Sequence, residues 1–403
     1  MADILFLTQR IPYPPMKGEK IRPLQILRHL RKSYDVHLGC LVDDPLDVQH
    51  IDTVRALCAT SYFAQIDRRQ KKIACLSGLL TGDPLSVTFY RDRGLADWIK
   101  RTIADIKPQA IFVCSSNMAP YVLDLKGGTL CLADLADVDS EKWRAYAQTA
   151  SFPMNWVYRR EWARVAALEE RIVRECAWSV FVSEPEAELF RNQHPPYRKK
   201  IAAVSNGVDL DYFDPARSFA PPYDTSKPNF TFTGTMDYPP NADAVIWFAE
   251  EILPLIRRTL PEAQFHIVGS SPAPQVKALE AIPGIFVTGR IPDVRPHVAH
   301  AVAVAPMRIA RGIQNKVLEA MAMGRPTVVT SDALEGIAAE PGRELFLADG
   351  AEAFAAACLE AAGPKGPGIG AAARARVLAD YAWPSLLTRF DALLNEGGKA
   401  GML

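Results

Sequence analysis

Strand and helix patterns alternate through the second half of this 403-residue chain. A segment with helical spacing of its apolar residues separates each short apolar run from the next. Parallel strands need such crossover connections, so the alternation predicts a parallel sheet with helices on both faces. The predicted strands are Phe230 to Thr233, Gln264 to Val268, Ile285 to Thr288, Ala301 to Ala305, Thr327 to Thr330 and Glu344 to Ala348.

The first half of the chain opens with the same pattern. Asp3 to Thr8 has the character of a buried strand, and a proline-rich loop from Gln9 to Gly18 leads into a helical segment. Residues 211–229 break the pattern with four prolines and few apolar side chains, which is typical of a linker. We therefore predict an α/β protein of two doubly wound, Rossmann-like domains facing a cleft, residues 1–210 and 230–375.

The C-terminal part has a different pattern. Gly363 to Gly370 combines glycine with proline and predicts a break between helices. A last helical segment is expected from Ala371 to about Leu394.

Charge and hydropathy exclude several classes of protein. The 46 basic and 46 acidic residues cancel, which argues against a general nucleic-acid binder. No apolar run approaches the ~20 residues of a membrane-spanning helix. The first residues lack the basic start and apolar core of a signal peptide. We expect a soluble, cytoplasmic protein.

The cysteines and histidines do not indicate a metal site. None of the seven cysteines forms a Cys-x-x-Cys pair, and Cys114 and Cys131 fall inside predicted strands. Free buried thiols are the expected state in a reducing compartment. Because the seven histidines also lack metal-ligand spacing, we expect no metal and no cofactor.

The stretch Ala305 to Thr330 carries the most chemistry. Its pattern is strand end, loop, helix, Gly-x-Pro turn and strand. Lys316 and Glu319 are three residues apart and share a helix face, while Arg308 comes from the loop. The helix N-terminus and the two cations suit a diphosphate, and the carboxylate suits a pair of sugar hydroxyls. The alternative is a helix whose Lys/Glu face is simply solvated.

A second polar cluster follows the predicted strand Thr129 to Asp134. Asp137, Asp139 and Ser140 lie just past the strand end, where an open α/β sheet places its site. Asp139 and Ser140 are interpreted as N-capping residues of the next helix. Asp137 is kept as a candidate site residue.

A run of basic residues, Asp67-Arg-Arg-Gln-Lys-Lys72, precedes an apolar segment. The run is interpreted as a solvated helix start. An alternative interpretation is a patch that touches anionic lipid headgroups.

The chain contains several further motifs. They are Tyr13-Pro-Pro-Met-Lys-Gly18, Ser205-Asn-Gly-Val-Asp209, the strand ends at Gly234, Gly269 and Gly289, Arg308 to Lys316, Glu319-Ala-Met-Ala-x-Gly-x-Pro326, and Asp137 to Trp143. Together they resemble the GT-B retaining glycosyltransferases of family 4, which make bacterial exopolysaccharides and lipid-linked glycans. The similarity covers nearly the whole chain. A narrower likeness is to the sugar transferases associated with PEP-CTERM exopolysaccharide systems.

The resemblance implies a retaining, metal-independent transfer from a UDP- or GDP-sugar to a glycan or lipid-linked acceptor. Glu319 would hold the donor ribose. Gly18 and the backbone of Gly312, Ile313 and Gln314 would meet the diphosphate, and Gly234 would line the donor site. Arg290 and Ile291 would contact the nucleobase. The resemblance also implies that 211–229 is a hinge-like linker and that 376–403 is a helix crossing back to the first domain.

Two positions depart from the family pattern. The family has a glutamate eight residues before Glu319, where this chain has Arg311, so Arg311 takes a donor-binding position. The family's Arg and Lys after the first strand of the second domain are also missing. Arg308 and Lys316 are expected to replace them as the catalytic cations, with Asp137 as the further catalytic candidate.

Two other functions remain open at this point. One is a catalytically inactive GT-B subunit that binds nucleotide sugars, and the other is a sugar-nucleotide 2-epimerase. Peripheral contact with the inner membrane is a further expectation.

Overall fold

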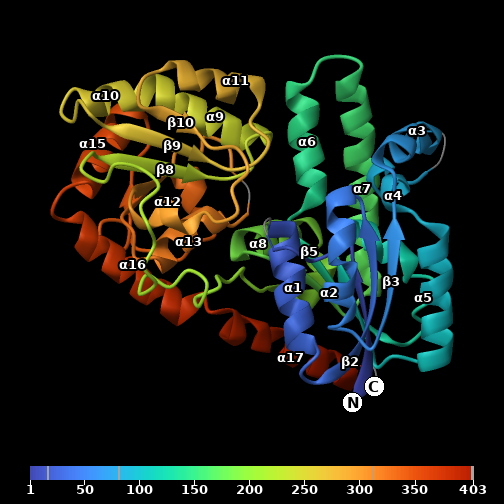
Figure 1. Ribbon diagram of the computed structural model, residues 1–403. Coiled ribbons are helices and arrows are strands. Elements are labelled where there is room, and N and C mark those ends of the chain that lie inside the picture. Colours follow the sequence, from blue (N-terminus) through green and yellow to red (C-terminus); the bar gives the residue numbers. More distant parts are fainter. Residues whose placement is uncertain (16–17, 80–81, 311, 401–403) are drawn as a thin grey trace. The chain divides into compact units, whose positions relative to one another are not determined.

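The structure is a computed structural model that describes residues 1–15, 18–79, 82–310 and 312–400. The chain divides into two compact units (Figure 1). Residues 1–205 and 387–403 form the first unit, and residues 206–386 form the second.

The first unit contains a parallel sheet in the order β3-β2-β1-β4-β5-β6-β7. The order runs one way from β1 through β2 to β3 and the other way from β4 onward, so the sheet is doubly wound. Its strands are β1 (Ala2–Thr8), β2 (Tyr34–Val42), β3 (Thr60–Gln65), β4 (Ala110–Cys114), β5 (Leu130–Ala136), β6 (Trp178–Phe181) and β7 (Ile201–Ala203).

Successive side chains of β1 point to opposite faces of this sheet, and they are buried on both faces. Leu5 and Leu7 belong to a core cluster with Leu95 of α5. On the other face Phe6 lies against Phe112, with ring centroids 5.5 Å apart. The helices are α1 (Gly18–Leu30), α2 (Ile51–Arg55), α3 (Arg68–Gly78), α4 (Leu85–Tyr90), α5 (Arg93–Ile106), α6 (Asp139–Thr149), α7 (Met154–Glu175) and α8 (Glu184–Gln193).

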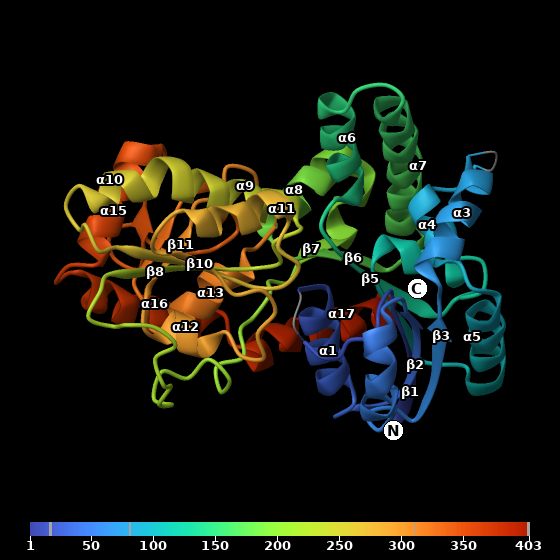
Figure 2. The same ribbon diagram turned by 45° about the horizontal axis from the view of Figure 1, so that its top comes forward.

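The second unit contains another parallel sheet, in the order β10-β9-β8-β11-β12-β13 (Figure 2). The prediction of two parallel-strand, doubly wound α/β sheets is confirmed. The strands are β8 (Asn229–Thr233), β9 (Gln264–Val268), β10 (Ile285–Val287), β11 (Val302–Ala305), β12 (Thr327–Val329) and β13 (Phe346–Leu347). The helices are α9 (Pro239–Trp247), α10 (Leu253–Arg257), α11 (Pro274–Lys277), α12 (Arg295–Ala299), α13 (Asn315–Ala322), α14 (Ser331–Leu334), α15 (Ala351–Ala361) and α16 (Gly366–Asp380).

The predicted break between helices is present but shorter than Gly363 to Gly370, because α15 ends at Ala361 and α16 begins at Gly366. The glycines allow close packing there. A Cβ at Gly370 would stand 2.2 Å from the carbonyl oxygen of Gly324, in the turn after α13. The last helical segment is also two helices, since α16 ends at Asp380 and α17 (Trp383–Ala400) follows.

Each of the two segments that we expected to connect the domains is assigned to one of the two units. Residues 211–229 fall within the second unit, where Tyr223 stacks on His266 with ring centroids 4.0 Å apart. From residue 387, α17 belongs to the first unit. There the ring of Phe390 lies 5.2 Å from that of Phe112.

A buried ion pair joins three parts of the first unit. Arg22 on α1 donates two hydrogen bonds to Asp134 at the end of β5, both 2.7 Å long. It also donates to the carbonyl oxygen of Val204, and its guanidinium lies 5.4 Å from the ring centre of Phe390. Both members of the pair are buried. The side chain of Arg22 therefore makes all the hydrogen bonds that join these parts.

We expect Arg22→Ala to lower the free energy of unfolding by about 3–5 kcal/mol, because Asp134 would stay buried without its partner. Arg22→Ala/Asp134→Ala should regain part of that loss. Arg101→Ala, on the exposed face of α5, is the matched control. Denaturant unfolding measures all three variants, and equal losses for Arg22→Ala and Arg101→Ala would contradict the expectation.

Candidate functional site

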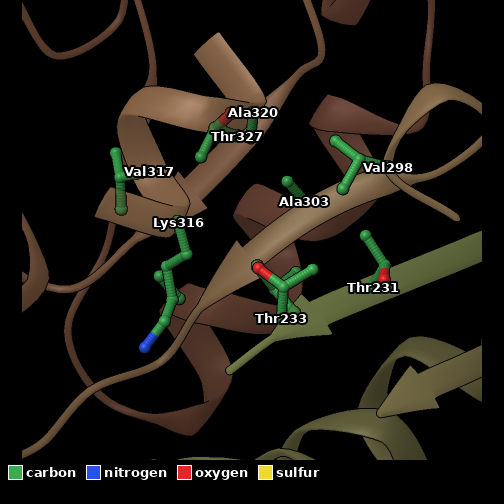
Figure 3. Close-up of a pocket in the computed structure, with 10 residues that line it drawn as sticks. Thr231, Thr233, Val298, Ala303, Lys316, Val317, Ala320 and Thr327 are labelled. Atoms are coloured by element: carbon green, nitrogen blue, oxygen red, sulfur yellow. The ribbon is translucent and has the colours of Figure 1, made fainter. Parts of the chain in front are cut away.

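The candidate site lies at the point where the strand order of the second sheet reverses. β8 pairs with β9 on one side and with β11 on the other. The loops that follow β8 and β11 leave the same sheet edge in opposite directions, and this is where open α/β sheets usually bind their ligands. Figure 3 shows Lys316 reaching from α13 past β11, the strand that carries Ala303.

Lys316 is held by an amide. Its ammonium donates to Oδ1 of Asn241 over 2.7 Å and lies 4.5 Å from the ring centre of Phe232. Nδ2 of Asn241 in turn donates to the carbonyl oxygen of Thr235, 3.0 Å away, so the amide is fixed in orientation. The ion pairs found among the described residues do not include Lys316. Its positive charge is therefore available to an anion.

Glu319 follows one turn later on the same half-buried face of α13. Burial raises the pKa of Glu319 to about 7, against the opposing pull of Lys316. Burial also lowers the pKa of Lys316 to about 7, although the nearby Glu319 carboxylate works against that shift. Both groups therefore change charge near neutral pH, and a bound ligand can decide their protonation states.

Backbone groups add to the site at the start of α13. Gln314 precedes the helix and its side chain makes no capping hydrogen bond. The first-turn N–H groups have no acceptor within the helix, and they sit at its positive end. Ile313 is buried in the core, so only its backbone can meet a ligand. Gly312 and Gln314 flank it, whereas Arg311 lies outside the described residues.

Arg308 was expected to face a donor diphosphate, and in the structure it is paired with Asp243. Its Nε and Nη2 donate to the two carboxylate oxygens of Asp243, at 3.0 and 2.5 Å. Its guanidinium also lies 5.3 Å from the ring centre of Trp247. Arg308 and Lys316 are thus both anchored to α9, through Asp243 and Asn241. The sequence analysis missed both anchors, although two polar residues at the start of the helix after β8 were a usable signal.

A close approach of two strand ends shapes the edge of the site. A Cβ added to Gly269 would stand 1.7 Å from the carbonyl oxygen of Gly234. Gly269 also has φ of +147°, which L side chains rarely adopt. A Cβ at Gly234 would in turn stand 2.7 Å from Nδ2 of Asn241. Gly234 therefore leaves room for the amide that holds Lys316.

Arg290 and Ile291 follow β10, two strands away from β8 along the same edge. Arg290 is exposed and Ile291 half-buried. Between them and β8, the N–H of Gly269 donates to the hydroxyl of Thr288 over 3.3 Å. The two residues thus lie on the β10 side of the edge.

A small cavity lies beneath this edge. Its volume is about 10 Å³, room for one water, and Thr231, Thr233, Val298 and the stem of Lys316 line it (Figure 3). The cavity is too small for a sugar nucleotide, so the candidate site is the open edge above it.

Gly18 and Asp137 belong to the first unit. Gly18 is exposed and begins α1. Asp137 follows β5, and one of its carboxylate oxygens is buried with no hydrogen-bond partner among the described residues. Burial, with smaller effects from Glu186 and Asp139, raises the pKa of Asp137 to about 7.

The interpretation of Asp139 and Ser140 as N-capping residues is wrong. Val138 occupies the N-cap of α6, and Asp139 instead accepts a hydrogen bond from the Ser116 hydroxyl over 2.7 Å. The N–H of Ser140 donates to Glu169 of α7, and that of Val138 to Glu186 of α8. Distant carboxylates therefore satisfy this helix start.

No group of three or more His, Cys, Asp or Glu side chains placed to hold a metal ion occurs in the described parts of the chain. The polar groups that the site offers are an ammonium, a carboxylate, an amide and backbone N–H groups.

Comparison with known proteins identifies the class of fold. Residues 227–363 match the family model "Glycosyl transferases group 1". No curated protein matches the sequence. Sucrose-phosphate synthase from Thermosynechococcus elongatus superposes with a TM-score of 0.71 at 17% identity, over 99% of this chain and 100% of that one. Anabaena HepE in complex with UDP superposes with a TM-score of 0.66 at 15% identity, over 98% and 100%.

The chain therefore has the GT-B glycosyltransferase fold. More particularly, residues 227–363 of its second unit resemble the group 1 type, and Lys316, Glu319 and their anchors lie within this segment.

Titration of Lys316 should appear in the pH dependence of stability. The unfolded chain keeps the lysine proton up to its ordinary pKa of 10.5, whereas the folded protein releases it near 7. The unfolded state binds more protons in this window, so stability gains from rising pH. The free energy of unfolding of the wild type should rise relative to Lys316→Met from pH 7 upward, by at most about 1.4 kcal/mol per pH unit.

Lys277→Met, on the exposed face of α11, is the control for this measurement. Its difference from the wild type should stay flat over the same pH range. A flat difference for Lys316→Met as well would show that Lys316 is not desolvated.

Proposed function

We propose that the protein is a retaining, metal-independent family 4 glycosyltransferase of the type associated with PEP-CTERM systems. It moves a sugar from a UDP- or GDP-sugar to a glycan or lipid-linked acceptor in exopolysaccharide synthesis. The reaction takes place in the cytoplasm, with peripheral contact at the inner membrane. The observation that carries the proposal is the ammonium of Lys316, which is held by the Asn241 amide and forms no ion pair among the described residues, beside Glu319 at the switch-point edge of a segment that resembles the group 1 type.

The donor diphosphate is proposed to bind at the start of α13. Lys316 and the backbone of Gly312 to Gln314 meet its oxygens, because the helix end and the ammonium both favour negative charge. The diphosphate raises the pKa of Lys316 and keeps it charged.

The rest of the donor follows from this placement. Glu319, one turn along α13, accepts hydrogen bonds from the two ribose hydroxyls, and these bonds favour its ionised form. Arg290 and Ile291 contact the nucleobase. Among the proteins with this fold, Anabaena HepE has been solved with UDP-glucose, and starch synthase IV of Arabidopsis thaliana with ADP and acarbose. Their ligands support a nucleotide-sugar donor here.

Transfer requires stabilisation of the departing diphosphate. The bond between the anomeric carbon and the diphosphate oxygen breaks, and a bond to the acceptor oxygen forms on the same face of the sugar. The acceptor proton passes to the leaving diphosphate. Lys316 stabilises the charge that gathers there, and Arg308 joins it by exchanging Asp243 for phosphate oxygens. Asp137 is proposed to orient the acceptor from the first unit.

Calorimetry with UDP- and GDP-sugars tests the donor site. One donor should bind the wild type, and Glu319→Ala should weaken its binding at least tenfold, since each hydrogen bond to a charged group contributes about 1.5–3 kcal/mol. Glu352→Ala, an exposed carboxylate on α15, should bind like the wild type. Equal affinity of Glu319→Ala and the wild type would remove Glu319 from the site.

The role of Arg308 is tested by turnover. Arg308→Ala should lower the rate of donor consumption by about 10²–10³, the usual effect of removing one preorganised group that stabilises charge in the transition state. Arg258→Ala, at the end of α10, is the control. An unchanged rate in Arg308→Ala would exclude Arg308 from the reaction.

The ion pair between Arg308 and Asp243 favours a second candidate function. A protein that keeps Arg308 paired would bind nucleotide sugars without cleaving them and would act as a subunit. Binding of a donor without release of nucleoside diphosphate, with every acceptor offered, identifies this case. A sugar-nucleotide 2-epimerase would instead convert the donor sugar without any acceptor.

A further inference from the structure

The tip of the α6–α7 hairpin exposes an unusual number of apolar side chains. Phe152 is 82% exposed, Trp156 55% and Met154 44%, all within five residues of the turn that joins the helices. Figure 1 and Figure 2 show α6 and α7 side by side, with this turn at the end remote from the sheet of the first unit. Adjacent exposed apolar side chains of this size mark an interaction surface.

The hairpin does not need these side chains for its own packing. Trp143 and Tyr146 of α6 contact Tyr158 of α7, with ring centroids 5.7 and 5.8 Å apart. These three rings join the helices below the tip. The exposed Phe152 and Trp156 can therefore be replaced without removing the contacts that hold the hairpin together.

Basic side chains outnumber acidic ones around the tip, although Arg144 is paired with Glu141 at the start of α6. Residues 142–168 contain five basic side chains, Lys142, Arg144, Arg159, Arg160 and Arg164, but only one acidic side chain. That residue, Glu161, is buried and accepts hydrogen bonds from the N–H groups of Leu85 and Ser86 at the start of α4. The surface of the hairpin tip is therefore cationic.

The neighbouring α3 extends this surface. Arg160 donates to the carbonyl oxygen of Gly78 over 2.6 Å, which ties the end of α3 to the first turns of α7. Ile73 on α3 is 71% exposed, and Arg68 and Arg69 are also exposed. The basic run identified in the sequence thus lies on the same helix as a second exposed apolar side chain.

We propose that the α6–α7 tip, assisted by α3, docks the protein on an anionic lipid bilayer. Phe152, Met154 and Trp156 enter the headgroup region, where amphipathic aromatic rings are favoured, and the arginines contact lipid phosphates. The combination of large apolar side chains with an excess of positive charge, which includes the exposed Arg159 and Arg164, favours a bilayer over an apolar protein partner. In the described part of the chain, no helix has both the length and the apolar character for crossing a membrane. This inference rests on the membrane contact of the proposed function and assigns it to particular residues, and it does not depend on the transfer reaction.

Docking at the tip gives the first unit a defined distance from the bilayer. α6 begins two residues after Asp137 and has 11 residues, which corresponds to ~16 Å. An acceptor anchored in the bilayer would need to span about this distance to reach the edge of the first sheet.

Sedimentation with vesicles tests the inference on the full chain. The protein should bind vesicles that contain equal amounts of phosphatidylglycerol and phosphatidylcholine. It should bind vesicles of pure phosphatidylcholine only weakly. Phe152→Ser/Trp156→Ser should lower the partition coefficient at least tenfold. Leu378→Ser, an exposed apolar residue of α16, should leave it unchanged.

A second pair of variants separates the role of charge. Arg159→Glu/Arg164→Glu should abolish the preference for phosphatidylglycerol, whereas Lys100→Glu/Arg101→Glu on α5 should keep it. Calorimetric donor binding should be the same in all these variants, so loss of vesicle binding and loss of the donor site are distinguishable. Vesicle binding by the tip variants equal to that of the wild type would overturn the inference. So would a wild type that ignores vesicles but forms dimers that Phe152→Ser/Trp156→Ser dissociates.

Discussion

The site of the second unit depends on one constraint, which is the reversal of strand order beside β8 in a fully parallel sheet. Parallel pairing places every strand's carboxyl end at one edge, and the reversal sends the connections after β8 and β11 to opposite faces. Asn241 from one connection then meets Lys316 from the other, across 75 positions of sequence. The same strand ends require glycine at positions 234 and 269, because their backbones approach closely.

The buried charge of Arg22 in the first unit has a carboxylate partner, whereas the charge of Lys316 in the second unit does not form an ion pair among the described residues. Arg22 in the first unit is fully satisfied by the carboxylate of Asp134 and a backbone carbonyl, and this arrangement serves stability. Lys316 donates to the amide oxygens of Asn241 and Gln314, and the ion pairs among the described residues include neither Lys316 nor Glu319. Burial therefore lowers the pKa of Lys316 and raises that of Glu319, both to about 7. A charge left without a carboxylate partner costs stability, which is why such groups are concentrated where a ligand completes them. The pattern distinguishes a structural ion pair from a site.

In the first unit, the α6–α7 hairpin connects the end of β5, where Asp137 lies, to the exposed tip. α6 starts next to Asp137 and ends at the exposed tip, and α7 returns to the core, where Glu169 satisfies the start of α6. Glu161 of α7 likewise fixes the start of α4. Because these carboxylates are used inside the unit, basic side chains outnumber acidic ones on the part of the hairpin near its tip, where Arg159 and Arg164 are exposed.

The sequence by itself determined the two series of alternating strands and helices, the position of the loop before α13 and the shared face of Lys316 and Glu319. These features follow from periodicity and from the local stereochemistry of glycine and proline, which act over a few residues. Only the tertiary structure decided that Asp243 pairs with Arg308, that Asn241 holds Lys316, and that Glu169 and Glu186 replace the expected caps of α6. It also decided that Gly366 and Gly370 belong to a helix, because close packing and not a break requires them. These outcomes depend on which strands become neighbours, and no local pattern contains that information.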